Sequence, residues 1–141
     1  MSRRRWALAA LMTLLVSVGV SLGAVAQDAG LAGRWTASFT VDDGAGGTKT
    51  VTGTIVAVAG RPGQPVRGSY RIPFSTVGLG PDAAPATLQA TRGDAVRIVL
   101  NPNGESGQAE LTGTWKVGAI EGEWRWVGGP KAASGRFTLR R

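Results

Sequence analysis

Residues 115–124, Trp-Lys-Val-Gly-Ala-Ile-Glu-Gly-Glu-Trp, decide how the fold is read. Gly118 suits the first position of a type II′ turn, which joins two antiparallel strands through a two-residue loop. In that register Val117 lies opposite Ile120. The stretch therefore predicts a tight β-hairpin with Gly118 and Ala119 as its loop.

The side chains of this hairpin agree with that register on both of its faces. Lys116 lies opposite Glu121, so opposite charges meet on one face. On the other face Trp115 lies opposite Gly122, and Gly113 lies opposite Trp124. A large ring that covers a facing glycine is called aromatic rescue. Because glycine weakens a strand, we interpret these glycines as the concave side of a strongly curved sheet.

A glycine followed two residues later by a large apolar residue recurs along the chain. Residues two apart in a strand face the same side, so each glycine lies on the apolar face. The pairs are Gly33/Trp35, Gly53/Ile55, Gly68/Tyr70, Gly113/Trp115, Gly122/Trp124 and Gly135/Phe137. The repeat predicts a series of similar curved strands.

Alternation of apolar and polar residues predicts eight strands, separated by turn residues such as Gly, Pro, Asn and Asp. They cover residues 31–41, 48–59, 66–74, 86–92, 95–101, 108–117, 120–127 and 134–140. Short connections predict an all-β fold, an eight-stranded antiparallel up-and-down meander closed as a small barrel, with a β-sandwich as the alternative. A membrane barrel is disfavoured because the aromatic residues lie in mid-strand and the chain is short for eight spanning strands.

The N-terminal residues have the features of a bacterial export signal. Basic residues 3–5 precede an apolar stretch at 6–25, and Ala24-Val25-Ala26 supplies small residues for cleavage. We predict a signal peptide at residues 1–26 and a single all-β barrel domain at 27–141. The alternative is a membrane anchor, since about 20 apolar residues span a bilayer.

Cleavage between Ala26 and Gln27 would leave the mature chain in the periplasm or outside the cell, with no membrane span. The basic start before Trp6 also fits a loose twin-arginine signal, so the export route stays open between this and the general secretory route.

Composition excludes several classes of function. The chain has no cysteine and no histidine, which excludes disulfides, Ser-His-Asp and Cys-His catalysis, and histidine-ligated metal sites. Without the three arginines of the predicted signal, 13 basic residues remain against nine acidic ones. Their signs alternate along the chain, which is typical of a solvated surface rather than a nucleic-acid groove. We expect no nucleic-acid partner, cofactor, metal or catalytic residue.

Two groups of acidic residues are candidates for a calcium site or a catalytic carboxylate pair. Asp42-Asp43-Gly44 and the loop at 101–105 are rich in the oxygen ligands of calcium, but these residues are also ordinary turn formers. Glu121 and Glu123 lie about 7 Å apart on one strand face, a spacing that glycosidase carboxylates can show. Their face also carries Arg125, which favours a solvated charge ladder.

A binding site is expected at one end of the barrel. In a meander the connections alternate between the ends, and the longer ones, at 42–47, 75–85, 101–107 and 128–133, share one end. We predict that a small apolar ligand enters between the connections 75–85 and 128–133. The side chains predicted to line its path are Tyr70, Phe74, Leu79, Trp124 and Trp126. The alternative is that these side chains only fill the barrel.

Leu31-Ala32-Gly33-Arg34-Trp35 resembles the Gly-x-Trp opening of lipocalins, and the Thr-Gly-Thr-Trp and Arg-Gly-Ser-Tyr units resemble strand starts of avidin-type barrels. The resemblance to these small exported calycin-like barrels implies Trp35 near the closed end. The other lipocalin signature, Thr-Asp-Tyr, is absent, and no residues match a biotin site. Arg136 and Arg140 are candidates to stack on Trp35.

Three functions follow as hypotheses. The first is an exported barrel that binds a small apolar ligand at its mouth. The second is a secreted inhibitor or protein-interaction module that uses its loops or N-terminal segment, as some small secreted barrels inhibit proteases. The third, an enzyme, is not expected. A filled interior would favour the second hypothesis over the first.

Overall fold

A computed structural model of the chain describes residues 30–42 and 46–141. The predicted signal peptide, its cleavage site and residues 43–45 lie outside the described residues. Within the described ranges, no helix has the length and hydropathy of a membrane-spanning segment.

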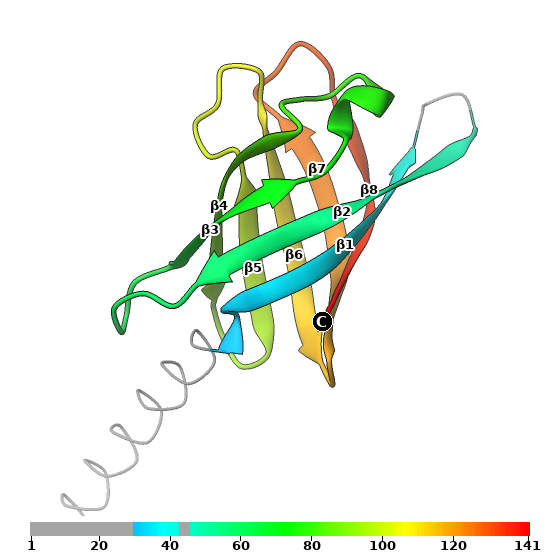
Figure 1. Cartoon of the computed structure of the whole chain (residues 1–141). Helices are drawn as coiled ribbons and strands as arrows, with labels where there is room; N and C mark the ends of the chain where they lie inside the picture. Colours follow the sequence, from blue (N-terminus) through cyan, green and yellow to red (C-terminus); the bar gives the residue numbers. More distant parts are fainter. Residues whose placement is uncertain (1–29, 43–45) are drawn as a thin grey trace, which may run out of the picture.

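The described residues form the predicted antiparallel barrel (Figure 1). Its strands are β1 (Gly33–Asp42), β2 (Thr48–Val58), β3 (Val66–Arg71), β4 (Ala83–Ala90), β5 (Ala95–Leu100), β6 (Gln108–Lys116), β7 (Ala119–Val127) and β8 (Ala133–Arg140). Each strand pairs with the next one along the chain, and β8 pairs with β1. The predicted up-and-down meander is confirmed, and the sandwich alternative is wrong.

The third and fourth strands depart most from the predicted boundaries. β3 ends at Arg71 rather than at residue 74, and Phe74 begins a short 3-10 helix, η1 (Phe74–Val77). Pro73 ends the ladder because it has no N–H to donate. The prediction that Phe74 extends β3 to the mouth is therefore wrong, because Phe74 belongs to the connection itself.

The predicted register of the β6–β7 hairpin is wrong by two residues. Lys116 pairs with Ala119, so the loop is Val117-Gly118 and glycine takes its second position. Gly118 has φ +72°, the left-handed angle that a type II turn requires at the second loop position. Ala119 is buried, whereas Val117 is fully exposed. In this register the Ala119 methyl group therefore belongs to β7, and Val117 belongs to the loop. A shift of two leaves every side chain on its predicted face.

Glycines of the concave face do lie opposite aromatic residues, but the pairs are formed between β7 and β8 and not between β6 and β7. Gly113 lies opposite Gly122, so the predicted Trp115 and Trp124 pairings are wrong. Instead Gly122 lies opposite Phe137, whose ring would come within 2.8 Å of a Cβ at Gly113. A Cβ on Gly122 would collide with the carbonyl oxygen of Thr112. Strong curvature therefore accounts for these glycines, as predicted.

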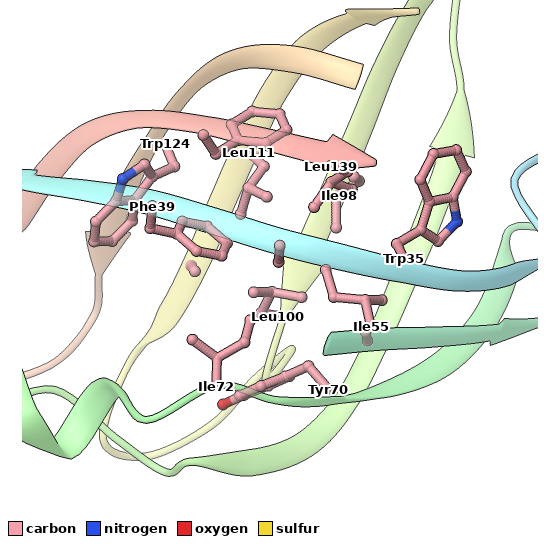
Figure 2. Close-up of a cluster of buried hydrophobic side chains, with 14 of the residues drawn as sticks. Trp35, Phe39, Ile55, Tyr70, Ile72, Ile98, Leu100, Leu111, Trp124 and Leu139 are labelled. Carbon is pink, nitrogen blue, oxygen red and sulfur yellow. The ribbon is translucent and has the colours of Figure 1, made fainter. Parts of the chain in front are cut away.

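The apolar faces of all eight strands point into the barrel and fill it. Phe39 packs among other aromatic rings, with ring centroids 5.4 Å from Trp124 and 6.3 Å from Phe137. Figure 2 shows Trp35 at one end of this buried cluster and Trp124 with Phe39 at the other. No polar or charged residue is buried among the residues described. The interior is thus a packed apolar core, as small eight-stranded barrels allow.

Candidate functional site

The structure brings the predicted site residues together, and it buries all of them. Tyr70, Leu79, Trp124 and Trp126 are at most 5% exposed, and Phe74 is fully buried. Phe74 is the centre of the group. Its ring centroid lies 5.7 Å from that of Tyr70, 6.1 Å from Trp124 and 5.4 Å from Trp126. The space in which a ligand was predicted to lie is filled by Phe74.

The polar atoms of these aromatic residues bond to the backbone of the barrel's own connections and first strand. Tyr70 Oη donates to the Pro81 carbonyl at 2.6 Å, and Trp126 Nε1 donates to the Ser106 carbonyl at 3.1 Å. Burial, together with the charge of Asp82, raises the pKa of Tyr70 to about 12. Among the described residues, no buried side-chain nitrogen or oxygen lacks a partner. None of these polar groups is left to orient a ligand inside the barrel.

Residues 72–82, which we call the cap, close this end of the barrel. The Ile72 N–H donates to the Asp82 carbonyl at 2.8 Å, which joins the two ends of the cap. The Asp82 carboxylate accepts bonds from the N–H and hydroxyl of Ser75 at 2.7 and 2.8 Å. The Leu79 N–H donates to the Phe74 carbonyl at 3.0 Å, so both apolar side chains turn into the mouth. The cap is therefore a plug, whose apolar side chains fill the end of the barrel.

The opposite end is closed around Trp35, as predicted. Trp35 is fully buried, donates Nε1–H to the Leu31 carbonyl at 2.9 Å, and lies 5.4 Å from the Trp115 ring. The residue that stacks on it is Arg141, with its guanidinium carbon 4.4 Å from the ring centroid. The prediction of Arg136 or Arg140 is wrong, because side chains at those strand positions point outward.

The line where β8 meets β1, which we call the seam, is joined by backbone pairing over only part of its length. The paired residues run from Thr36 to Phe39 in β1. Beyond them the Thr40 hydroxyl replaces the ladder, accepting from the Arg136 N–H at 2.9 Å and donating to its carbonyl at 3.3 Å. Trp124 Nε1 donates to the Thr40 carbonyl at 2.9 Å, which is possible because Gly135 has no side chain in the way. Thr40 is thus the last fastening of the seam.

Above Thr40 the ends of β1 and β2 diverge from β8 (Figure 1). A cleft of about 700 Å³ lies there, which we call the seam cleft. It is lined by Val41, Asp42, Lys49 and residues 76–78 on one side, and by residues 125–127 and 131–134 on the other. This is the place between the connections 75–85 and 128–133 where a ligand was predicted to enter. Of the predicted site residues, only Trp126 lines it.

The charges around the seam cleft are mostly positive. Lys49 and Lys131 both line it, and Lys131 Nζ donates to the Val77 carbonyl at 3.1 Å. Arg125 is matched by Glu110, with contacts of 3.2 and 3.0 Å to one carboxylate oxygen. The bond from Arg125 lowers the pKa of the Glu110 carboxyl. Asp42 is the acidic residue of the lining, so the cleft favours negatively charged groups.

Of the acidic residues considered in the sequence, Glu121 forms ion pairs, and Asp43 lies outside the described residues. Glu121 lies 3.1 Å from Lys116 and 4.0 Å from Arg140 on the outer face. In the 101–105 loop, the Asn101 side chain donates to the Gly107 carbonyl at 2.8 Å, and Asn101 and Asn103 both adopt left-handed backbone angles. Both features are those of a turn. Among the residues described, no three acidic side chains gather into a metal site.

Sequence reasoning missed the opening of the seam. Its signal lies in residues 132–135, Ala-Ala-Ser-Gly, a strand start without bulky side chains after the Gly128-Gly129-Pro130 turn. No protein-family model and no curated protein sequence matches the chain.

Proposed function

We propose that the chain is an exported β-barrel binding protein that holds a segment of another protein in its seam cleft. The observation that carries this proposal is the contrast between a filled interior and an open cleft at the loop end. A small apolar ligand inside the barrel would have to displace Phe74 and Leu79. The seam cleft needs no such displacement.

The lining of the cleft supports a protein partner. It combines an indole and aliphatic groups with backbone and lysines, and such mixed surfaces are common in protein interfaces. Binding residues are also often carried by loops that a rigid scaffold holds in place. Here the barrel is the scaffold, and the cap and the β7–β8 connection are the loops.

Export is part of the proposal and is supported by the N-terminal sequence. We also propose a calycin-like layout, supported by Gly33-Arg34-Trp35 at the start of β1 and by Trp35 at the closed end. N-terminal sequencing of the secreted chain is expected to begin at Gln27. Recovery of residues 1–26 in the membrane fraction would contradict the export proposal.

Site-specific photocrosslinking tests the binding function. We would place p-benzoylphenylalanine at Val127 in the seam cleft and, as a matched control, at Val58 near the other end of the barrel. In a host that exports the chain, we expect a discrete adduct with a protein from position 127 and none from position 58. Equal labelling at both positions, or none at either, would contradict the proposal.

The small-ligand hypothesis gives a different result. An uncharged apolar dye such as Nile red would then bind the native barrel and quench tryptophan fluorescence, and Trp126→Phe would change that response. We expect no binding of the dye to the folded protein, because the interior is filled.

A further inference from the structure

We infer that the seam cleft binds its partner as an added β-strand, an extended peptide with an acidic side chain that pairs with the free edge of β8. This inference rests on the proposed function and names the class of partner. Addition of a strand to an exposed sheet edge is a general mode of peptide recognition.

The backbone of β8 supplies the first argument. In an antiparallel ladder, alternate residues direct N–H and C=O to opposite neighbours. Arg136 directs both groups away from β7 and towards Thr40. Ser134, two residues earlier, therefore directs its N–H and C=O to the same side. There β1 has diverged, so these groups face the seam cleft.

The space along this edge supplies the second argument. Ala133 and Ser134 are small, and they line the cleft together with Val41 and Trp126. Strands advance about 3.4 Å per residue, so residues 132–135, which lie beyond the Thr40 bonds, present an edge for a segment of about four residues. Exposed edges usually carry a proline, a bulge or an inward charge that blocks pairing. The sequence of residues 132–135 has no proline and no charge.

Charge selects the partner. Lys49 and Lys131 both line the cleft, while Arg125 is already matched by Glu110. A carboxylate on the bound strand would be attracted by these two lysines. A second copy of the chain fits poorly, because its β8 edge would bring another Lys131 and Arg136 to the same place. The geometry thus points to an acidic peptide of a different protein.

The probes are short synthetic peptides with fluorescent labels. The parent is acetyl-Thr-Val-Asp-Val-Thr-amide, and a second peptide replaces Asp with Lys. Two further versions carry N-methyl groups on alternate residues, so that each removes the donors of one edge of the strand. Fluorescence anisotropy against the mature protein measures binding.

We expect the Asp peptide to bind about tenfold or more tightly than the Lys peptide, the change that about 1.4 kcal/mol produces. We expect N-methylation of one alternate set to abolish binding and methylation of the other set to leave it unchanged. Equal effects of the two sets, or no binding by the Asp peptide, would overturn the inference.

Variants of the protein test whether the peptide pairs with the edge of β8. Ser134→Pro removes the N–H that faces the cleft but none of the N–H groups that bond to β7. We therefore expect a folded barrel that no longer binds the Asp peptide. Lys131→Glu is expected to weaken binding about tenfold, whereas the control Arg61→Glu, in the β2–β3 connection, is expected to have no effect. Circular dichroism melts check that Ser134→Pro and Lys131→Glu both fold. Retained binding by folded Ser134→Pro would overturn the inference.

Two outcomes separate this inference from the proposed function. A crosslinked adduct at position 127 that survives Ser134→Pro would keep the seam cleft as the binding site and overturn strand addition. A dimer in sedimentation experiments that Ser134→Pro abolishes would assign the edge to a second copy, and that also overturns the inference.

Discussion

The two ends of the barrel are closed in different ways. Towards the end that holds Trp35, β1 and β8 pair through their backbones from Phe39 down to Thr36, and Leu31 and Arg141 contact the indole beyond the last pair. At the other end the ladder stops at Phe39, and the Thr40 hydroxyl fastens the seam through side-chain bonds. One end is sealed by the strands and their flanking residues, and the other by a separate cap.

This difference separates scaffold from site. Where two strands pair, their facing backbone N–H and C=O groups are already bonded, so a partner could contact only the side chains there. Where the pairing stops, the strand edge keeps donors and acceptors for another chain. The cap allows this, because Phe74 and Leu79 fill this end of the barrel, where Phe74 packs on Phe39 of β1. The barrel can thus leave its seam open at the loop end without exposing its interior.

The largest expected effect comes from removing the plug. Phe74→Ala is expected to lower the free energy of unfolding by about 3–5 kcal/mol, because it empties a site ringed by four aromatic residues. Ser75→Ala, next to it but exposed, is the control and is expected to cost much less. Urea denaturation measures both.

The cavity left by Phe74→Ala also tests how this end is filled. Dry apolar cavities in proteins bind benzene. We expect benzene to raise the melting temperature of Phe74→Ala and to leave that of the unmodified protein unchanged. Stabilisation of the unmodified protein would mean that the barrel already holds a ligand cavity.

The next effect comes from the fastening at Thr40. A methyl group at Gly135 would collide with the Thr40 carbonyl oxygen and with the approach of Trp124. Gly135→Ala is therefore expected to lower the free energy of unfolding by about 3 kcal/mol, because the backbone must move to make room for the methyl group. Gly60→Ala is the matched control at the other end, where the added carbon would lie 3.8 Å from its nearest neighbour, the Pro65 carbonyl. Equal losses in thermal melts would contradict the role given to the seam.

The same contrast explains which features were predictable from sequence. Alternation and turn residues are local signals, and they were enough to predict the meander and the buried face of each strand. The register of β6 and β7 escaped them, because a shift of two residues leaves the alternation unchanged. The prediction chose Gly118 as the first loop residue, and only the burial of Ala119 against the neighbouring strands decides otherwise.

The seam escaped prediction for a different reason. The bonds that fasten it join Thr40 to Arg136 and to Trp124, 96 and 84 residues away in sequence. No local pattern marks such a pair. The site aromatics were predicted to gather at one end, and they do. Whether they would line a pocket or fill it depended on Phe74, which a proline at position 73 moves from the strand into the cap.

Titration of Tyr70 gives a smaller effect that probes the cap directly. Ionisation would put a phenolate in the apolar barrel near Asp82, and this raises the pKa from 10.0 to about 12. The unfolded chain therefore loses this proton first. The resulting stabilisation is fully present below pH 10 and is lost as the pH rises through 12. The chain has one tyrosine, so the phenolate absorbance reports this group alone.

We expect an absorbance midpoint near pH 12 in the native protein and near pH 10 in denaturant. Tyr70→Phe is expected to remove the part of the alkaline stability loss that falls between these values. A native midpoint at the unfolded value would mean that the cap opens readily.

The smallest effect is expected at the closed end. Arg141→Gln removes the cation from the face of Trp35 and the bond to the Gly30 carbonyl. A cation–π contact of this kind contributes about 0.5–1 kcal/mol. Arg140→Gln is the matched control, because that side chain points outward and lies 4.0 Å from Glu121. The closed end is held mainly by the ladder of β1 and β8, so neither change should affect peptide binding at the seam cleft. An Arg141→Gln loss as large as that of Phe74→Ala would mean that the arginine, and not the strand pairing, closes this end.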